Sequence, residues 1–204
     1  MSEAQAPVDR RQQIIDEGLA ILREEGLRGF TQPRIAARAG LRQSNLTYYF
    51  PTRTDLLTAV ATAAVQGQLA AASGVVARVS TSEQAAEGIA GITTRHEATR
   101  VLVSLAQAAD QEPTVRALFE TLVDGLTAEI RTLFGRLGIA PEQSNVDLVH
   151  ALAVGLSVIN LATNRRDAKV RAKEAVHSLL PLLATEPTRP AGRRASSRKS
   201  PKAV

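Results

Sequence analysis

Residues 31–57 read TQPRIAARAGLRQSNLTYYFPTRTDLL, and this stretch decides the fold of the N-terminal part of the chain. It predicts two short helices joined by a tight turn. Thr31 is a good N-cap for the first helix, and Gly40 occupies the turn, where a positive φ is easiest for glycine. Pro51 ends the second helix, because the residue before a proline is disfavoured in the helical region.

The packing residues in this stretch have the spacing of a helix-turn-helix. Counting from Gln32, a small residue, a glycine and an aliphatic residue stand at positions 5, 9 and 15, which are Ala36, Gly40 and Leu46. The small side chain lets the two helices approach, and the aliphatic one packs between them. These three positions alone occur by chance in many helical proteins, so the prediction depends on the whole stretch.

The positions left on the outer face of the second short helix are polar. They are Arg42, Gln43, Ser44, Asn45, Thr47 and Tyr48. Amides can pair with the edge of adenine, and hydroxyls and cations can reach phosphates, so this face predicts a recognition helix for the major groove. Arg53, at the mouth of the next helix, can meet a phosphate with help from the dipole at that helix's N-terminus.

The run LTYYFPTRTDLL at residues 46–57 resembles the signature that closes the DNA-binding domain of the TetR (tetracycline-repressor-like) family. The run GFTQPRIAARAGL at residues 29–41 resembles the second helix and turn of that family, and the specific match covers about residues 10–57. By this resemblance, the residues at DNA-contacting positions are Thr31, Gln32, Gln43, Ser44, Asn45, Thr47, Tyr48, Tyr49 and Arg53. For Tyr49, packing against the core is an equally good interpretation.

Three residues depart from the family pattern. Thr47 stands where an aromatic residue is more usual, Arg53 stands where lysine is more usual, and Pro33 replaces a polar residue. These departures leave the fold prediction unchanged, but they make the operator sequence unpredictable.

The rest of the chain predicts an all-α fold of about nine helices, with a three-helix helix-turn-helix domain first and a helical bundle behind it. Apolar residues recur at helical spacing, and no segment alternates convincingly with a period of two. Besides the two short helices, the expected helices cover about residues 10–25, 53–79, 82–91, 95–111, 113–137, 142–163 and 168–184. Thr52 or Thr54 can cap the helix that ends near residue 79, and Pro181 should kink or shorten the last helix.

Composition and the resemblance together divide the chain into four parts. We expect a flexible arm at residues 1–9, a DNA-binding domain at 10–55, a ligand-binding and dimerisation domain at 56–185 and a disordered basic tail at 186–204. The net charge of +5 comes from the tail, because without the six cations from residue 187 onward the chain has 19 basic against 20 acidic residues. DNA contact by the body therefore needs a local patch. The tail either adds non-specific attraction to phosphates or only keeps the chain soluble.

The resemblance implies a ligand cavity among the middle helices. Its candidate liners are His96, Thr99, Ser104, Gln107, Phe119, Leu122, Asp124 and Asn160. His96 is also typical of a solvated helix end, and Asn160 needs a polar partner that either a ligand or a second subunit can supply. With only 3% aromatic residues, the chain suits a lipid-like or acyl ligand better than a flat aromatic one.

The last two expected helices predict a homodimer. A single helix-turn-helix buries too little DNA surface for tight specific binding, so dimers that read two half-sites are the rule. The helix at 142–163 is apolar almost all round, and with the helix at 168–184 it resembles the dimerisation helices of the family. The alternative is a single-chain core without dimerisation.

The sequence lacks the residues and motifs that enzymes, cofactor sites and metal sites usually require. The chain has no cysteine, its three histidines form no spaced metal motif, and nucleophile-elbow, phosphate-loop and dinucleotide fingerprints are missing, so we expect no enzyme, cofactor or metal site. The polar start predicts no secretory leader, which favours the cytoplasm. Polar residues interrupt the uncharged runs at 56–77 and 148–164, so we expect helices of a soluble protein rather than membrane spans.

These observations predict a sequence-specific transcriptional regulator, a repressor that a small molecule releases from a palindromic operator. A non-specific, nucleoid-type DNA-binding protein is the alternative, and it would make mostly phosphate contacts. The polar, lysine-free face of the expected recognition helix favours specific reading of bases.

Overall fold

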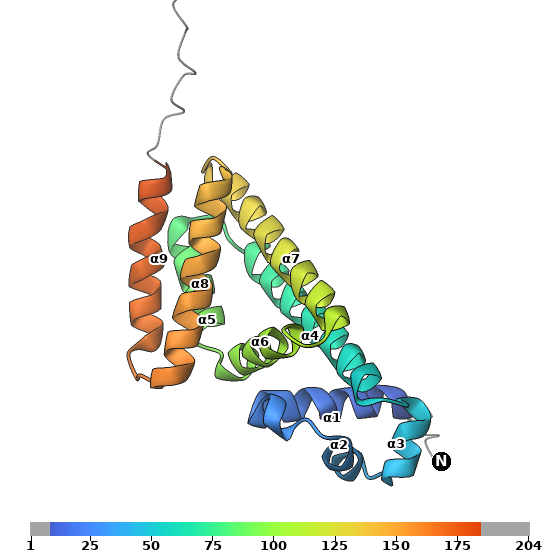
Figure 1. Ribbon diagram of the computed structural model, residues 1–204. Coiled ribbons are helices and arrows are strands. Elements are labelled where there is room, and N and C mark those ends of the chain that lie inside the picture. Colours follow the sequence, from blue (N-terminus) through green and yellow to red (C-terminus); the bar gives the residue numbers. More distant parts are fainter. Residues whose placement is uncertain (1–8, 185–204) are drawn as a thin grey trace, which may run out of the picture.

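The computed structural model describes residues 9–184, and within them the chain is helical throughout, as the sequence predicts (Figure 1). The expected arm falls almost wholly in residues 1–8 and the expected basic tail in residues 186–204, both outside the described residues. The helices are α1 (Arg10–Glu25), η1 (Leu27–Gly29), α2 (Gln32–Arg38), α3 (Gln43–Tyr49), α4 (Arg53–Val76), α5 (Ser82–Thr93), α6 (His96–Ala109), α7 (Pro113–Leu137), α8 (Gln143–Thr163) and α9 (Ala168–Ala184).

Local sequence explains where α4 begins. The Thr52 hydroxyl accepts a hydrogen bond from the amide of Asp55, and the Asp55 carboxylate accepts one from the amide of Thr52. This capping box satisfies amides that have no partner inside the helix. Of the two caps that the sequence offered, the structure therefore uses Thr52. The Thr54 hydroxyl instead points to the Glu112 carboxylate, 3.3 Å away, at the start of α7.

Several expectations about helix ends need correction. The helices expected at 82–91 and 95–111 run from Ser82 to Thr93 and from His96 to Ala109. The fourth helix ends at Val76 rather than near residue 79, because the chain turns there and Val79 folds back into the core. Pro181 does not end the last helix, which continues to Ala184.

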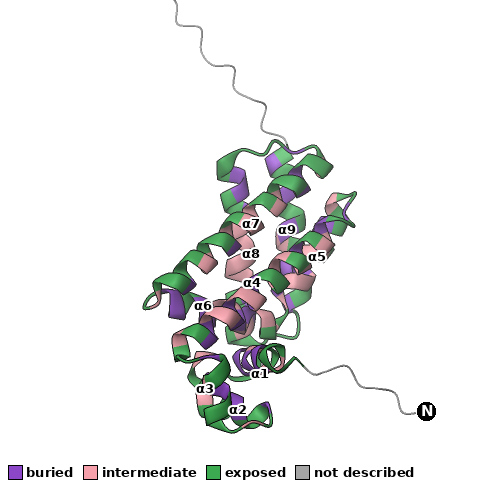
Figure 2. Cartoon of the chain, turned by 90° about the vertical axis from the view of Figure 1, so that its right-hand side faces the viewer, coloured by how far each residue is buried: buried purple, intermediate pink, exposed green. Residues whose placement is uncertain are grey.

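The described chain has two hydrophobic cores. The first core extends from the helix-turn-helix into the helices of the body. This first core joins buried side chains of α1 to α4 with side chains of α6 and α7, among them Val101, Leu105 and Leu122. The second core joins the end of α4 with α5, α7, α8 and α9 around Phe134 and Leu180. Figure 2 shows the buried residues of α1 close to α4 and α6. The N-terminal helices α1 to α3 therefore share one core with α6 and α7.

Two glycines let neighbouring helices come close at these junctions. A Cβ on Gly18 of α1 would lie 2.7 Å from the Val60 side chain of α4, and a Cβ on Gly125 of α7 would lie 2.5 Å from the Leu69 side chain of α4. Since such distances are too short for carbon atoms, a side chain at either position forces its neighbour to shift. The close contact of α1 with α4 therefore requires glycine at position 18.

The α5–α9 contact combines an apolar seam with exposed ion pairs. Lys173 lies 2.6 Å from Glu83 and 3.6 Å from Glu87, and Lys169 lies 2.5 Å from Glu87. Hydrogen bonds from these lysines hold the pKa values of both glutamates below the usual range. Because all four side chains are exposed to water, the pairs orient α9 more than they stabilise it.

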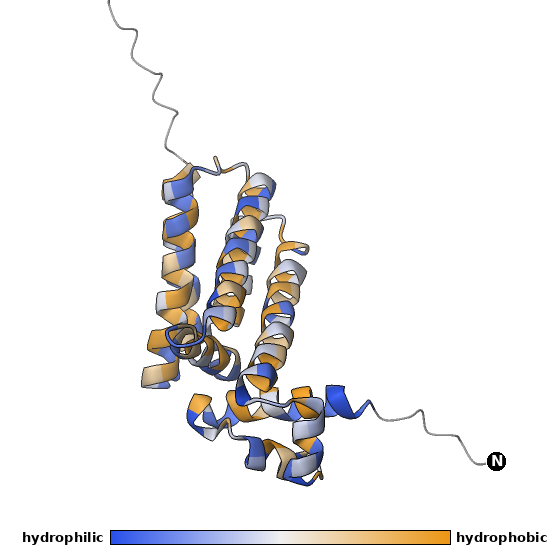
Figure 3. Cartoon of the chain, turned by 45° about the vertical axis from the view of Figure 1, so that its right-hand side comes forward, coloured by the Kyte–Doolittle hydropathy of each residue, from blue (hydrophilic) through white to orange (hydrophobic). Residues whose placement is uncertain are grey.

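In the described part of the chain, α4 and α8 are long and apolar enough to span a membrane by length and composition alone. Helices from the core of a soluble protein pass the same test. Figure 3 shows hydrophobic and hydrophilic residues mixed along the helices of the body, and α4 packs between α1 and α7.

A pair of glycine substitutions tests the close contact between α1 and α4. We expect Gly18→Ala to lower the free energy of unfolding by about 1–3 kcal/mol, because the new methyl group overpacks against Val60. Gly67→Ala on α4 is the control: no atom lies within 4 Å of its Cβ position, so better helix propensity should stabilise the chain by about 0.5–1 kcal/mol. Urea unfolding followed by circular dichroism, at one protein concentration, measures both. Equal effects of the two variants would contradict a tight contact at Gly18.

Candidate nucleic-acid interface and body cavity

The turn between α2 and α3 has the helix-turn-helix geometry that the spacing of Ala36, Gly40 and Leu46 predicts. Gly40 has a φ of 66°, and the amide of Leu41 donates to the carbonyl of Ala36 over 2.8 Å. Ala36 and Leu46 are buried where the two helices meet. A residue with a side chain at position 40 would be strained, because the left-handed region suits glycine.

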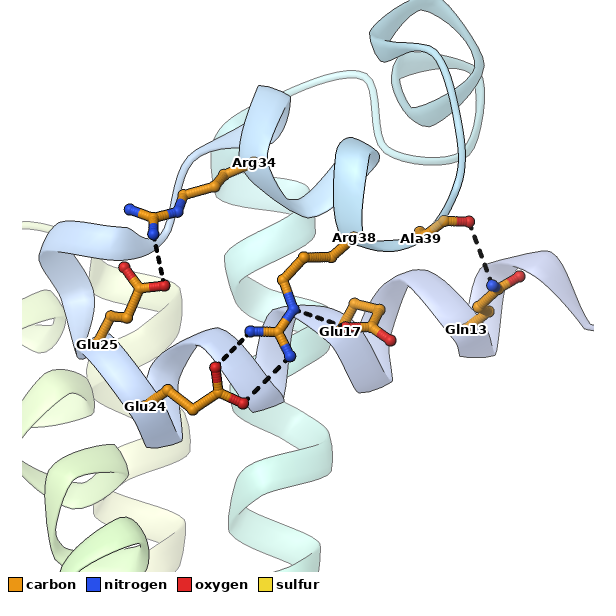
Figure 4. A network of polar contacts seen from close by, with 7 residues as sticks. All are labelled: Gln13, Glu17, Glu24, Glu25, Arg34, Arg38 and Ala39. Carbon is orange, nitrogen blue, oxygen red and sulfur yellow. Dashed lines mark hydrogen bonds and ion pairs between the residues drawn. The ribbon is translucent and has the colours of Figure 1, made fainter.

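Charged contacts hold α2 on α1 (Figure 4). Arg38 lies 2.5 Å from Glu24 and 2.9 Å from Glu17, and Arg34 lies 2.7 Å from Glu25. The hydrogen bonds of Arg38 raise its own pKa and lower the pKa of Glu24. Both α2 arginines are thus occupied by carboxylates of α1, so they contribute little free positive charge toward an anion.

The outer face of α3 is polar and open to solvent. Arg42, Gln43, Ser44, Asn45 and Tyr48 are exposed, and Tyr48 has 82% of its surface accessible. No side-chain hydrogen bond occupies the amides of Gln43 and Asn45 among the described residues, so both are free to meet a base edge. The structure therefore brings the predicted base-reading residues together on one helix face at an end of the molecule (Figure 1).

The remaining residues of the predicted interface surround this face. Thr31 is exposed, Gln32 is half-buried with its Nε2 atom buried and unpartnered, and Thr47 is half-buried with its hydroxyl donating to the Ser44 carbonyl. Tyr49 has 36% of its surface exposed, and its ring meets that of Tyr48 edge-on, with centroids 5.3 Å apart. Tyr49 is thus neither a core residue nor a freely projecting one.

Two arginines flank the domain by lying over buried phenylalanines. The guanidinium of Arg53, at the start of α4, lies 6.0 Å from the ring centroid of Phe30. That of Arg11, in α1, lies 5.0 Å from the ring centroid of Phe50, which follows α3 directly. The sequence did not predict this position of Arg11, because nothing in the chain before α2 indicates that the start of α1 comes beside the end of α3.

The body contains a cavity enclosed by α4, α5, α6, α7 and α8. Its volume is about 150 Å³, and its wall is mostly small and aliphatic, with Val75, Ile89, Leu102, Leu126 and Val154 among the residues that line it. No phenylalanine, tyrosine or tryptophan of the described chain lines it. Pockets for drug-sized ligands usually measure about 300–1,000 Å³, so a larger guest would have to widen this one.

The cavity includes two of the eight residues that the sequence nominated for a ligand. Thr99 and Leu122 line its wall. His96 lines a separate hollow between α1, α4 and α6, and Ser104 is buried with its hydroxyl donating to the carbonyl of Arg100. The other four are not among the residues that line the cavity: Gln107 and Asp124 are exposed, Phe119 packs against the first core, and Asn160 is buried. The Asn160 amide donates to the Thr93 carbonyl over 3.2 Å, so a residue of this same chain satisfies it.

Polar residues that the sequence did not nominate also line the cavity. They are Gln68, Thr93, Arg95, Glu129, His150 and Ser157. The amide of Gln68 donates to the carbonyl of Ala98, and the hydroxyl of Ser157 donates to that of Ala153. Burial lowers the pKa of His150, an effect that the carboxylate of Asp147 opposes, so this imidazole is neutral at pH 7. Sequence alone could not select these residues, because helical periodicity does not say which neighbour a polar side chain faces.

Helix α6 lies between the cavity and the N-terminal helix-turn-helix domain. On one side Thr99 and Leu102 line the cavity. On the other, Val101 and Leu105 belong to the first core, and the Arg100 side chain donates to the carbonyl of Arg23 near the end of α1. A shift of α6 therefore reaches α1 through direct contacts.

An apolar face of α8 and α9 is left uncovered. Leu148, Val158 and Ile159 of α8 and Val170 and Leu182 of α9 are large, apolar and exposed. Leu148 and Leu182 also line a groove of about 320 Å³ between the two helices. Apolar patches of this kind mark surfaces that meet another macromolecule.

Residues 9–184 contain no group of three or more histidine or acidic side chains that could hold a metal ion. No curated protein matches the chain. Residues 14–60 match the sequence model of the family described as bacterial regulatory proteins, tetR family.

Three solved structures illustrate the similarity of the whole fold. A putative transcriptional regulator from Saccharomonospora viridis in complex with choline has a TM-score of 0.74 at 13% identity, over 86% of this chain and 97% of its own. A transcriptional regulator from Rhodococcus sp. Rha1 has a TM-score of 0.73 at 15% identity, over 85% and 95%. A tetR-family transcriptional regulator from Streptomyces coelicolor has a TM-score of 0.71 at 19% identity, over 87% and 82%.

The family match lies on the helix-turn-helix, and the shared fold extends over the body as well. Together they confirm the resemblance read from residues 46–57: the N-terminal helix-turn-helix matches the tetR family of bacterial regulatory proteins, and the described chain has the fold of such regulators.

Proposed function

We propose that the chain works as a homodimeric, sequence-specific repressor that a small-molecule effector releases from a palindromic operator. One observation carries the proposal. Helix α6 lines the body cavity and also packs in the core that supports the exposed polar face of α3. The same bundle thus links an empty space that can hold an effector to a surface that can read DNA.

The division into a DNA-binding domain at residues 10–55 and a ligand-binding and dimerisation domain at 56–185 is part of this proposal. The two parts differ in proposed role, but they do not pack as separate units. The boundary falls inside α4, and the first core contains residues from both sides of it. Movement of the body can therefore change the position of α3. We further propose that the chain acts in the cytoplasm, where the DNA is.

The uncovered face of α8 and α9 supports a dimer. Leu148, Leu152, Gly155 and Ile159 follow one another at helical spacing on α8, and no atom lies within 4 Å of the Cβ position of Gly155. An open glycine between apolar side chains allows a second helix to approach closely. Two-fold symmetry would then place two α3 helices about 34–36 Å apart, the spacing of successive major grooves.

Release requires the effector to prefer one arrangement of the dimer. An effector that binds better when α4 and α6 have shifted moves the population toward that state, and the two α3 helices then no longer match successive grooves. The choline complex of the Saccharomonospora viridis regulator supports the idea that this fold can hold a small organic molecule.

Selection from a random-sequence DNA pool with the full chain, at near-physiological salt, tests the function first. We expect enrichment of a palindrome with half-sites about one helical turn apart. Binding without an enriched motif would instead support a non-specific DNA-binding protein, and the absence of binding would contradict the role given to α3.

Two substitutions separate reading of bases from phosphate attraction. We expect Asn45→Ala to cost about 1–3 kcal/mol at the selected site and to relax preference at one base pair, because a bidentate amide contact is lost. Arg53→Ala should weaken binding to every sequence and make the salt dependence shallower by about one released counterion. Fluorescence-anisotropy titrations over a series of salt concentrations measure both. Identical changes in specificity for the two variants would exclude base reading by Asn45.

Ile159→Glu tests the dimer, since this side chain has 56% of its surface exposed in one chain. We expect the variant to become monomeric and to lose at least about tenfold in operator affinity, because two carboxylates would meet across the two-fold axis. Ala128→Glu, on the exposed side of α7, is the matched control and should remain dimeric. Analytical ultracentrifugation decides, and a dimeric Ile159→Glu would place the interface elsewhere.

A further inference from the structure

We propose that the body cavity selects a small amphiphile with one positive charge and an aliphatic body, and that the carboxylate of Glu129 is the counter-ion for that charge. The inference rests on the proposed function, in which this cavity is the effector site, and it names the class of effector.

Glu129 stands in an apolar stripe of α7. Leu122, Leu126, Glu129 and Leu133 follow one another at spacings of four, three and four residues, and all four line the cavity. Side chains at this spacing share one helix face. An acidic residue on a face that is otherwise leucine is directed toward the same space as the leucines.

The Glu129 carboxylate has no protein partner in the described chain. No hydrogen bond or ion pair to it occurs within residues 9–184, and the side chain is only partly exposed. A carboxylate that lines a mostly apolar wall and has no protein partner can form an ion pair with a bound cation. The cavity thus offers a better environment to a positive charge than to a neutral group.

The other charged or titratable side chains that line the cavity do not neutralise the negative charge of Glu129. Arg95 lies at the N-cap of α6 and is exposed, so water already solvates its guanidinium and screens its charge. No ion pair joins it to Glu129. His150 is neutral at pH 7, because burial lowers its pKa. A ligand carboxylate would therefore meet Glu129 as a like charge, with only a screened Arg95 to compensate.

The rest of the cavity wall determines the chemistry of the uncharged part of the ligand. Aliphatic side chains suit an alkyl group, and the absence of aromatic residues from the described wall removes the ring faces on which a flat cation stacks. The expected aliphatic ligand agrees with this wall, but an acyl carboxylate head group does not. An alkylamine or alkylammonium ion satisfies both the leucines and Glu129.

Three probes with the same octyl chain test the proposal on the full-length protein: octyltrimethylammonium, octanol and octanoate, each titrated by calorimetry below its micelle concentration. We expect the cation to bind at least about tenfold more tightly than the alcohol, and octanoate to bind most weakly. Glu129→Gln should lose at least about tenfold in affinity for the cation and leave the alcohol within about twofold, because only the charge is removed. The matched control, Arg95→Gln, should leave the affinity for the cation unchanged or slightly raised.

Ala153→Leu, which fills the cavity from α8, should weaken all three probes and so confirm where they bind. Thermal unfolding of each variant checks that it is folded. Equal binding of cation and alcohol, unaffected by Glu129→Gln, would overturn the counter-ion while leaving the cavity as an effector site. Tightest binding of octanoate, lost in Arg95→Gln, would overturn the charge of the ligand. Binding of none of the probes by a wild-type chain that still binds its operator would overturn both the proposed effector site and this inference.

Discussion

The contact between α1, α4 and α6 is the constraint on which the rest of the molecule depends. α3 is seven residues long, and a helix of that length has too few internal hydrogen bonds to be stable by itself. It persists because Leu46 and Phe50 bury their side chains in the first core. That core is completed by residues of α6 and α7, so the body supports the recognition surface directly.

At the N-terminal end, most charged side chains lie on α1 and α2, whereas the exposed face of α3 is mostly uncharged. The ion pairs of Arg34 and Arg38 with α1 fix α2 in place and leave the face of α3 to uncharged amides and hydroxyls, with Arg42 at its start. A surface of this kind attracts phosphate weakly and discriminates between bases through geometry. This face supports the sequence-specific binding that we propose.

The body has the opposite character. Its helices are joined by small aliphatic side chains, and the space they leave contains one partly buried carboxylate among leucines. Aliphatic contacts are non-directional, whereas the turn between α2 and α3 has a fixed hydrogen-bonded geometry. The proposed effector control combines this fixed turn with the empty space in the body.

The sequence by itself determined the helices and the reading face. Residues 10–25, 113–137 and 168–184 were predicted with the bounds that α1, α7 and α9 have, because caps, prolines and helical periodicity act within a few residues of one another. The polar face of α3 followed from the same local logic.

Only the tertiary structure decided which side chains share a space. It placed Thr99 and Leu122 at the cavity but left out Gln107 and Asp124, and it brought Arg11 beside Phe50. Periodicity indicates which side of a helix is buried, but the crossing of helices distant in sequence determines what that side meets. For this reason, the residues that share the exposed face of α3 could be named from the chain alone, and the residues of the cavity could not.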